Sequence, residues 1–245
     1  MALADLIHSD DEFVPTKALL VVAHPDDIDF GAAGTVATLT DHGVEVVYGL
    51  ATSGQAGEPS HLDPDELREI RQKEQTDAAA IVGVSELHWL DFPDGHLVAD
   101  LALRKAIARL IRVVKPDLVI TQNPERNLDR IYAAHPDHLA TGEAAVSAVY
   151  PDARNGHSFP ELLDEGHEPH AVPRLWLMAG TVHNLHVDIT DAIDRKIDAL
   201  LAHDSQNGPR ADGLPAMIRD WAHGNAAAAG HKGRAIESFR VVHTE

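Results

Sequence analysis

The chain has 245 residues, of which 44% are hydrophobic, and it contains no cysteine. This length can bury the core of one α/β domain, and the composition is that of a globular protein rather than a disordered one. The formal net charge of −19 argues against nucleic acid and anionic membrane surfaces as partners. No apolar run approaches the roughly 20 residues of a membrane-spanning helix.

Two further expectations follow from the composition and the N-terminal sequence. Because cysteine is absent, a metal site has to use histidine and carboxylate ligands, and a disulfide framework is excluded. Residues 1–12 are acidic and lack the basic start and apolar middle of a signal peptide, which favours a cytoplasmic protein. Homo-oligomerisation is possible but leaves no clear mark in the sequence.

Strands and helices alternate along the first half of the chain. Residues 17–23 form a continuous apolar run followed by turn residues, which is typical of a buried parallel strand. We expect further strands at 44–50, 87–90 and 117–121, and helices at 30–42, 64–82 and 101–114. The helix at 64–82 has three boundary signals: Asp63 can cap its start, Pro64 suits its first position, and Gly83 suits its end.

The alternation continues in the second half. The pattern predicts helices at 136–149, 192–203 and 215–229, and strands at 174–179, 186–189 and 239–242. Residues 154–173 are polar and rich in His, Gly and Pro, so we expect a long surface loop there. Together these elements predict a single-domain, Rossmann-like α/β fold with a mostly parallel sheet and helices on both faces.

Two His-Pro-Asp tripeptides carry the most specific chemical proposal. The first lies in His24-Pro25-Asp26-Asp27, directly after the first expected strand, and the second in His135-Pro136-Asp137-His138, at the head of a helix. Open α/β sheets bind ligands beyond the carboxyl ends of their strands, so the two motifs can converge on one crevice. Either motif alone would also be a good helix start, because Pro suits the first turn.

A catalytic zinc has three protein ligands and keeps a position for water, and His24, Asp27 and His138 make a reasonable set. Iron(II) or another divalent ion fits the same ligands. Asp26 is the nearest carboxylate that could take a proton from the water. A metal is also favoured because acidic groups packed beside a buried strand are costly without a cation.

The second motif supplies groups for charge stabilisation. When hydroxide attacks an amide carbonyl, negative charge develops on oxygen, and a protonated His135 is placed to stabilise it. Asp137 is expected to hold His135 in one orientation and to favour its charged form.

With these two motifs, the chain resembles the LmbE-like (PIG-L) zinc-dependent de-N-acetylases. The paired motifs carry the resemblance, and residues 31–35, 71–83, 90–95, 187–190 and 203–206 support it, so that residues 1–245 are expected to form one such domain. The resemblance implies a zinc hydrolase that removes an N-acetyl group from an N-acetylglucosamine-type conjugate, with a small amino sugar as partner.

The resemblance also implies residue roles. Zinc would be bound by His24, Asp27 and His138, and the catalytic residues would be Asp26 as general base and His135 as stabiliser or acid, with Asp137 behind it. Arg71 resembles a substrate-binding arginine. The alternative for Arg71 is a surface ion pair with Glu74 at a spacing of three residues, which contributes only about 0.2–0.5 kcal/mol.

Two other functions stay open from the sequence. An amidase acting on a larger mycothiol-type conjugate would use the same metal chemistry on a different bond. A non-catalytic sugar- or nucleotide-binding module with a structural ion would leave Asp26 and His135 without a task. This module also lacks support because the turn after the first strand has no Gly-x-Gly-x-x-Gly phosphate motif. Residues 203–206 can either reach the site or simply end a helix.

Overall fold

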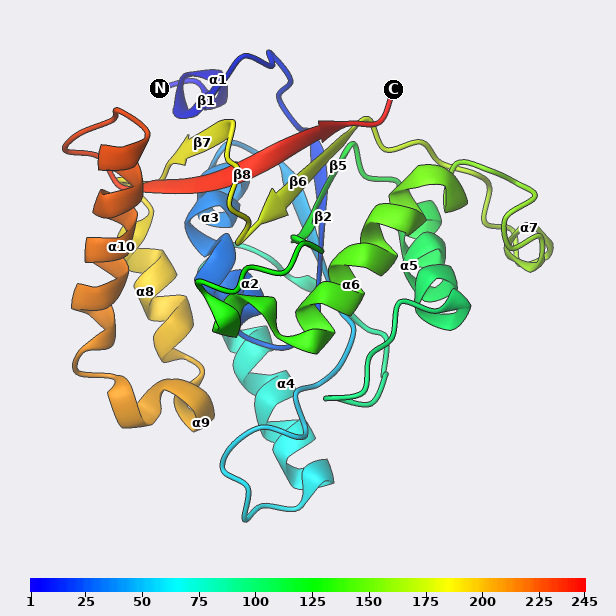
Figure 1. Cartoon of the computed structure of the whole chain (residues 1–245), viewed down its shortest axis with the longest axis horizontal. Helices are drawn as coiled ribbons and strands as arrows, with labels where there is room; N and C mark the ends of the chain where they lie inside the picture. Colours follow the sequence, from blue (N-terminus) through cyan, green and yellow to red (C-terminus); the bar gives the residue numbers. More distant parts are fainter.

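Eight strands form one sheet in a computed structural model that describes residues 1–245 (Figure 1). Their order across the sheet is β1-β7-β8-β6-β5-β2-β3-β4. The strands are β1 (Ile7–Ser9), β2 (Lys17–Val22), β3 (Glu45–Leu50), β4 (Glu86–Trp89), β5 (Leu118–Gln122), β6 (Arg174–Met178), β7 (Leu185–Asp188) and β8 (Ile236–His243).

The run from β6 through β5, β2 and β3 to β4 is parallel, which confirms the mostly parallel sheet. The other edge is mixed: β8 is antiparallel to β6 and β7, and β1 is antiparallel to β7. The carboxyl ends of the parallel strands therefore lie at one edge of the sheet, where the two His-Pro-Asp motifs begin.

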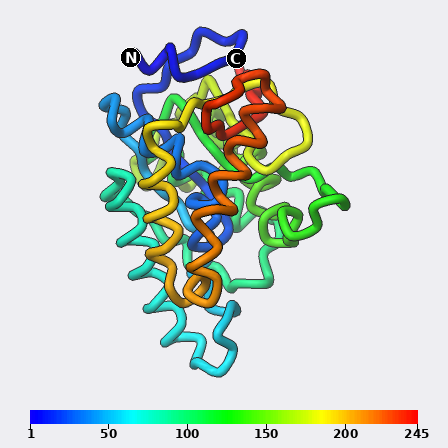
Figure 2. Tube along the Cα trace, turned by 90° about the vertical axis from the view of Figure 1, so that its left-hand side faces the viewer, coloured from blue at the N-terminus to red at the C-terminus, as the bar shows by residue number.

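Helices cover both faces of the sheet, as predicted. In Figure 1, α8 and α10 lie on one side and α5 and α6 on the other, and Figure 2 shows α4, α8 and α10 side by side. The α-helices are α1 (Leu3–Leu6), α2 (Asp27–Gly31), α3 (Ala33–Asp41), α4 (Pro64–Ile81), α5 (Leu101–Val114), α6 (Pro136–Ser147), α7 (Glu161–Asp164), α8 (Ile193–Leu201), α9 (Asp204–Asn207) and α10 (Leu214–Ala228). Short 3₁₀ segments are η1 (Ile131–Ala134) and η3 (Gly208–Arg210), and η2 (Ala148–Asp152) is a π-type turn. No helix is both long and apolar enough to cross a membrane.

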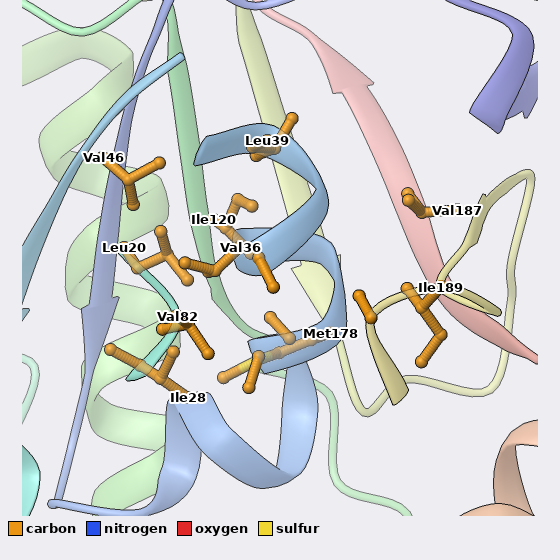
Figure 3. Packing of buried hydrophobic residues seen from close by; sticks show 14 of the residues in the cluster. Leu20, Ile28, Val36, Leu39, Val46, Val82, Ile120, Met178, Val187 and Ile189 are labelled. Carbon is orange, nitrogen blue, oxygen red and sulfur yellow. The ribbon is translucent and has the colours of Figure 1, made fainter. Parts of the chain in front are cut away.

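Strand β2 separates two hydrophobic cores. Leu20 and Val22 point into the core under α3 and α8, while Leu19 and Val21 point into the core under α5 and α6. Figure 3 shows part of the first core, with Val36 of α3 packed near Leu20. Burial on both faces explains why the sequence of this strand is continuously apolar instead of alternating.

The helix expected at 30–42 is wrong in its start and its continuity. It begins at Asp27 and is interrupted at Ala32, whose φ of −148° leaves the helical range, so α2 and α3 are separate. The carboxylate of Glu237 on β8 accepts the backbone N–H groups of Gly34 (3.1 Å) and Thr35 (2.7 Å). A helix start needs acceptors for its free N–H groups, and here a residue about 200 positions away supplies them.

Smaller differences lie near both ends of the chain and in the loop at 154–173. α1 and β1 were not expected, β8 starts three residues earlier than the expected strand, and the loop at 154–173 contains the short helix α7. α1, β1 and α7 have only three or four residues, and the extent of β8 is set by its pairing with β6 and β7, so tertiary contacts outweigh local sequence preference here.

Candidate metal centre

The two His-Pro-Asp motifs meet at the carboxyl end of β2. The ring centroids of His24 and His138 lie 5.2 Å apart, and His135 lies 5.2 Å from His24 and 5.3 Å from His138. Ring nitrogens of these imidazoles fall within 4.8 Å of one another, close enough to share one ion. The convergence predicted from the strand ends is confirmed.

Asp27 lies between two of the imidazoles. Its Oδ1 is 3.0 Å from Nε2 of His138, and its Oδ2 is 3.3 Å from Nδ1 of His24. Such separations are close to the roughly 3.3 Å between neighbouring ligand atoms of a tetrahedral zinc, given zinc–ligand bonds of about 2.0 Å. The side-chain amide of Gln122 donates to Oδ2 of Asp27 at 2.9 Å and holds the carboxylate in place.

The carboxylate of Asp27 is ionised, as a metal ligand must be. Burial raises the pKa of Asp27, but the charges and hydrogen bonds of His138 and His24 outweigh this effect and hold that pKa well below 3.8. The carboxylate therefore presents negative charge between the two rings.

The far nitrogens of both imidazoles have acceptors. Nε2 of His24 faces Oδ1 of Asp94 at 3.0 Å and Oδ2 of Asp137 at 3.3 Å, and Nδ1 of His138 lies 3.4 Å from the carbonyl of Ala133. A histidine that binds a metal through one nitrogen typically donates its other N–H to a carboxylate or carbonyl. The residues therefore fit a divalent metal held by His24, Asp27 and His138.

Asp26 lies beside this set without contacting the two imidazoles. Its backbone is left-handed (φ 78°), which is unusual for a residue other than glycine. The backbone N–H of Asp26 donates to Oε1 of Gln75 at 2.8 Å. Burial raises the pKa of Asp26 to about 6, the Arg71 guanidinium opposes this rise, and the neighbouring carboxylate of Asp27 adds to it.

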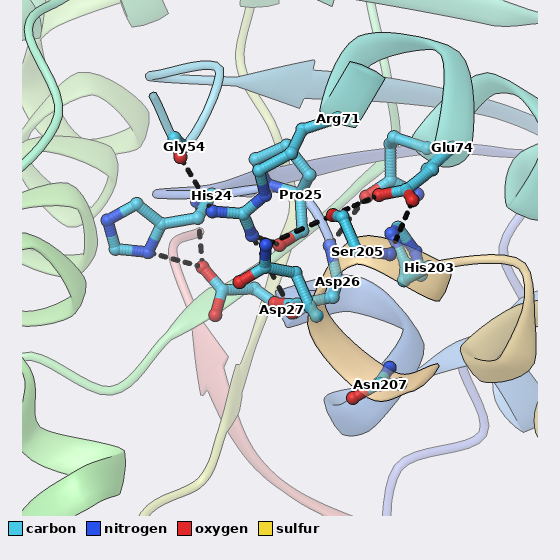
Figure 4. A network of polar contacts seen from close by, with 12 residues as sticks. His24, Pro25, Asp26, Asp27, Gly54, Arg71, Glu74, His203, Ser205 and Asn207 are labelled. Atoms are coloured by element: carbon cyan, nitrogen blue, oxygen red, sulfur yellow. Dashed lines mark hydrogen bonds and ion pairs between the residues drawn. The ribbon is translucent and has the colours of Figure 1, made fainter. Parts of the chain in front are cut away.

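Arg71 is buried, with 5% of its surface exposed, so the surface pair with Glu74 is wrong. Its Nη1 donates to the carbonyl of Gly54 at 2.8 Å, its Nη2 donates to the carbonyl of Pro25 at 2.9 Å, and Nη2 lies 3.6 Å from the Asp26 carboxylate (Figure 4). Glu74 instead accepts the backbone N–H and hydroxyl of Ser205, each at 2.7 Å.

Residues 203–206 reach the back of the site. Nε2 of His203 lies 2.8 Å from Oδ2 of Asp29, and the same oxygen accepts the Nε2 amide of Gln75 at 2.9 Å. His203, Asp29 and Gln75 are fully buried. A chain of hydrogen bonds thus runs from His203 through Asp29 and Gln75 to the backbone of Asp26.

Asp137 has a different partner from the one expected. Its carboxylate accepts the backbone N–H groups of Gly95 (2.7 Å) and Leu97 (3.2 Å) and faces His24. The contact with His135 runs through the backbone: the N–H of Asp137 donates to Nδ1 of His135 at 3.2 Å. Asp137 is the second residue of α6 and His135 is its N-cap, so the capping bond uses the backbone N–H of Asp137 and leaves the carboxylate to its other partners.

Two residues of the site had no role in the sequence analysis. Asp94 faces His24. The ligand atoms of His24, Asp94 and Asp137 all lie within 4.8 Å of one another, so these three residues form a second group that could hold a metal. The family-like stretch 90–95 contains Asp94, but nothing local showed which imidazole it meets. Gln75 lies in the family-like stretch 71–83, but its contact with Asp26 could not be foreseen, because one glutamine in a polar helix looks like a solvated residue.

Comparisons with known proteins agree with this geometry. The family model PIG-L, described as GlcNAc-PI de-N-acetylase, matches residues 19–149. The diacetylchitobiose deacetylase of Thermococcus kodakarensis is 34% identical over 191 residues, which cover 78% of this chain and 70% of that protein. The probable N-acetyl-alpha-D-glucosaminyl L-malate deacetylase 2 of Bacillus cereus is 34% identical over 230 residues, which cover 90% and 95%.

Among solved structures, the N,N′-diacetylchitobiose deacetylase from Pyrococcus horikoshii has a TM-score of 0.85 and 31% sequence identity. The match covers 93% of this chain and 84% of that one, so the two chains share the same overall fold. The family model and these relatives together show that this chain belongs to the PIG-L family of de-N-acetylases.

Proposed function

We propose that the protein is a zinc-dependent hydrolase that removes the N-acetyl group from an N-acetylglucosamine-type amino-sugar conjugate, with water as the attacking reagent. The observation that carries the proposal is the position of Asp27 between His24 and His138, with the Asp26 carboxylate beside them. Relatives named as deacetylases of such conjugates support the substrate class.

His24, Asp27 and His138 would hold the zinc. When bound, zinc lowers the pKa of a water ligand from about 15.7 to about 7 and polarises the carbonyl that is attacked. Asp94 and Asp137 orient the His24 ring through its Nε2, so its Nδ1 is left free to bind.

Asp26 would take the proton of the attacking water. Its carboxylate has only the Arg71 guanidinium, 3.6 Å away, as a side-chain partner, so it keeps oxygen lone pairs for this task. The left-handed backbone of Asp26 allows two successive aspartates to play different parts, with Asp27 toward the metal and Asp26 beside it.

His135 would stabilise the oxygen that gains negative charge, or protonate the leaving amine. Its Nδ1 accepts the backbone N–H of Asp137, so in the neutral ring the proton is on Nε2, where it can be donated to the substrate. Asp137 therefore acts here as a positioning residue for both His24 and His135.

Arg71 would bind the sugar at the edge of the site. Each of its Nη atoms uses one N–H on a backbone carbonyl and keeps a second N–H that a sugar hydroxyl can accept. Its contact with Pro25 also fixes the turn that carries Asp26 and Asp27.

The test is acetate release by the purified full chain, loaded separately with zinc and iron(II), from N,N′-diacetylchitobiose and N-acetylglucosaminyl malate. We expect one acetate and one free amine for each molecule consumed. Failure of the metal-loaded protein to release acetate from any such conjugate would overturn the proposal. Cleavage of a thiol conjugate without acetate would support the amidase, and sugar binding without turnover the non-catalytic module. Cytoplasmic location and homo-oligomerisation stay predictions.

A further inference from the structure

A cavity of about 60 Å³ lies between α2, α10 and residues at the ends of β6 and β8. Phe30 and Gly31 form one wall, and Trp221 of α10 lies on another. Asp27 and Gly31 are the first and last residues of α2, so the metal ligand and the cavity are separated by about 6 Å of helix rise. A group attached to a sugar at the metal centre would have to extend over about this distance to enter the cavity.

Arg130 lines this cavity and contacts two aromatic rings. Its guanidinium carbon lies 5.4 Å from the ring centroid of Trp221 and 5.4 Å from that of Tyr132. Its Nε donates to the Tyr132 hydroxyl at 3.0 Å. No carboxylate pairs with the guanidinium, so Nη1 and Nη2 keep all of their N–H groups for a ligand. Two neighbouring donors of this kind match the two oxygens of a carboxylate or phosphate.

The charges around the cavity favour an anion. Lys196 also lines it, but its Nζ is 2.6 Å from the Glu237 carboxylate, and both are buried, so this pair is neutral in sum. His183, the other titratable lining residue, adds no negative charge. The cavity thus carries the unbalanced positive charge of Arg130 in a chain whose net charge is −19.

The same segment joins this cavity to the catalytic residues. Arg130 directly precedes η1, and His135 directly follows it. A ligand that binds Arg130 therefore contacts the segment between β5 and α6, which ends at His135. On the opposite wall, α2 connects the cavity to Asp27. Helix α2 and segment η1 therefore each connect a wall of the cavity to the metal centre, although the two sites share no lining residue.

We infer that this cavity is a subsite for an anionic group, a carboxylate or a phosphate, on the part of the substrate attached to the amino sugar. The inference rests on the proposed function and narrows its substrate class to acidic conjugates. Arg130 is the specificity-determining residue: it pairs with the anion through Nη1 and Nη2 while the acetamido group lies at the metal centre.

The experiment compares three substrates in the zinc-loaded full chain: neutral N,N′-diacetylchitobiose, N-acetylglucosaminyl malate and N-acetylglucosamine 1-phosphate. The variants are Arg130→Gln, Arg130→Lys and, as a matched control, Arg219→Gln, which removes one exposed arginine of α10 paired with Asp194. Binding of the deacetylated products, which are glucosaminyl malate and glucosamine 1-phosphate, is measured by calorimetry as a readout independent of turnover.

We expect Arg130→Gln to lower kcat/KM about tenfold or more for at least one acidic conjugate, chiefly through KM, and to leave the neutral substrate unchanged. Arg130→Lys should restore part of this loss, and Arg219→Gln should have no effect. The substrate that is affected shows whether the site prefers carboxylate or phosphate.

If Arg130→Gln lowers kcat/KM equally for neutral and acidic substrates, or for neither, the anionic subsite is overturned while the deacetylase function stands. If no substrate is turned over, the proposed function fails, and the calorimetric affinity still decides on the anion site: equal product affinity in the wild type and Arg130→Gln would overturn it.

Discussion

Oε1 of Gln75 accepts the backbone N–H of Asp26 at 2.8 Å, while the amide of the same side chain donates to Asp29. One buried glutamine therefore fixes the left-handed turn that turns Asp26 away from Asp27. This contact connects helix α4 to the candidate site, and it gives the two adjacent aspartates the different orientations that their proposed roles as metal ligand and base require.

Replacing Gln75 with leucine should lower kcat about tenfold or more while KM stays within about twofold of the wild type. The buried N–H of Asp26 loses its acceptor, which costs about 1–3 kcal/mol and lets the carboxylate leave its catalytic position. Steady-state kinetics on an N-acetylglucosaminide, with zinc content measured in parallel, check this.

The control for Gln75→Leu is Gln72→Leu, one turn earlier on α4. Gln72 donates to the Ser53 hydroxyl at 2.8 Å and does not touch Asp26. Equal loss of kcat in both variants would show that Gln75 matters only for helix stability and would contradict a positioning role.

Replacing Gly54 with alanine should raise KM about tenfold or more. A Cβ at this position would lie 2.1 Å from Nη1 of Arg71, so the guanidinium would have to move. Gly43→Ala is the matched control, because Gly43 also has positive φ (+80°) but nothing lies within 4 Å of its Cβ position.

Both glycine substitutions should reduce the free energy of unfolding by about 1–2 kcal/mol through backbone strain alone. Only Gly54→Ala should change KM. A KM increase of the same size in Gly43→Ala would mean that strain, and not displacement of Arg71, causes the effect.

His203 should make the stability of the fold depend on pH. Burial lowers the pKa of His203, but the hydrogen bond and charge of Asp29 outweigh this effect and raise that pKa above 6.5. Protonated His203 therefore contributes stability that is fully present below about pH 6.5 and is lost as the pH rises through the raised value.

Urea unfolding of the wild type and His203→Gln from pH 6 to pH 9 checks this sign. We expect the difference in unfolding free energy to be largest at pH 6 and to shrink toward pH 9. A difference that is constant or grows with pH would show that His203 is neutral in the folded protein.

The sequence predicted the fold well where a strand is buried on both faces of the sheet. The continuous apolar run of β2 is a direct consequence of burial between two helical layers, so its position was readable. The break at Ala32 was not, because it depends on Glu237 of β8 accepting the first N–H groups of α3.

The candidate site likewise has a part that the sequence predicts and a part that it does not. Its proposed metal ligands lie in two short motifs whose strand and helix positions made convergence predictable. The partners behind them come from separate elements: Asp94 from the connection after β4, Gln75 from α4 and His203 from the turn between α8 and α9. Their side chains meet only after folding, and no spacing in the sequence encodes which imidazole or backbone group each one contacts.

The most direct test of the account measures zinc content and turnover together in Asp26→Asn and His138→Ala. Asp26→Asn should keep the zinc of the wild type and lose about 10²–10⁴-fold in kcat, because only the proton acceptor is removed. His138→Ala should lose both zinc and activity. Near wild-type turnover of zinc-loaded Asp26→Asn would contradict the assignment of the base, and full zinc retention in His138→Ala would contradict the ligand set.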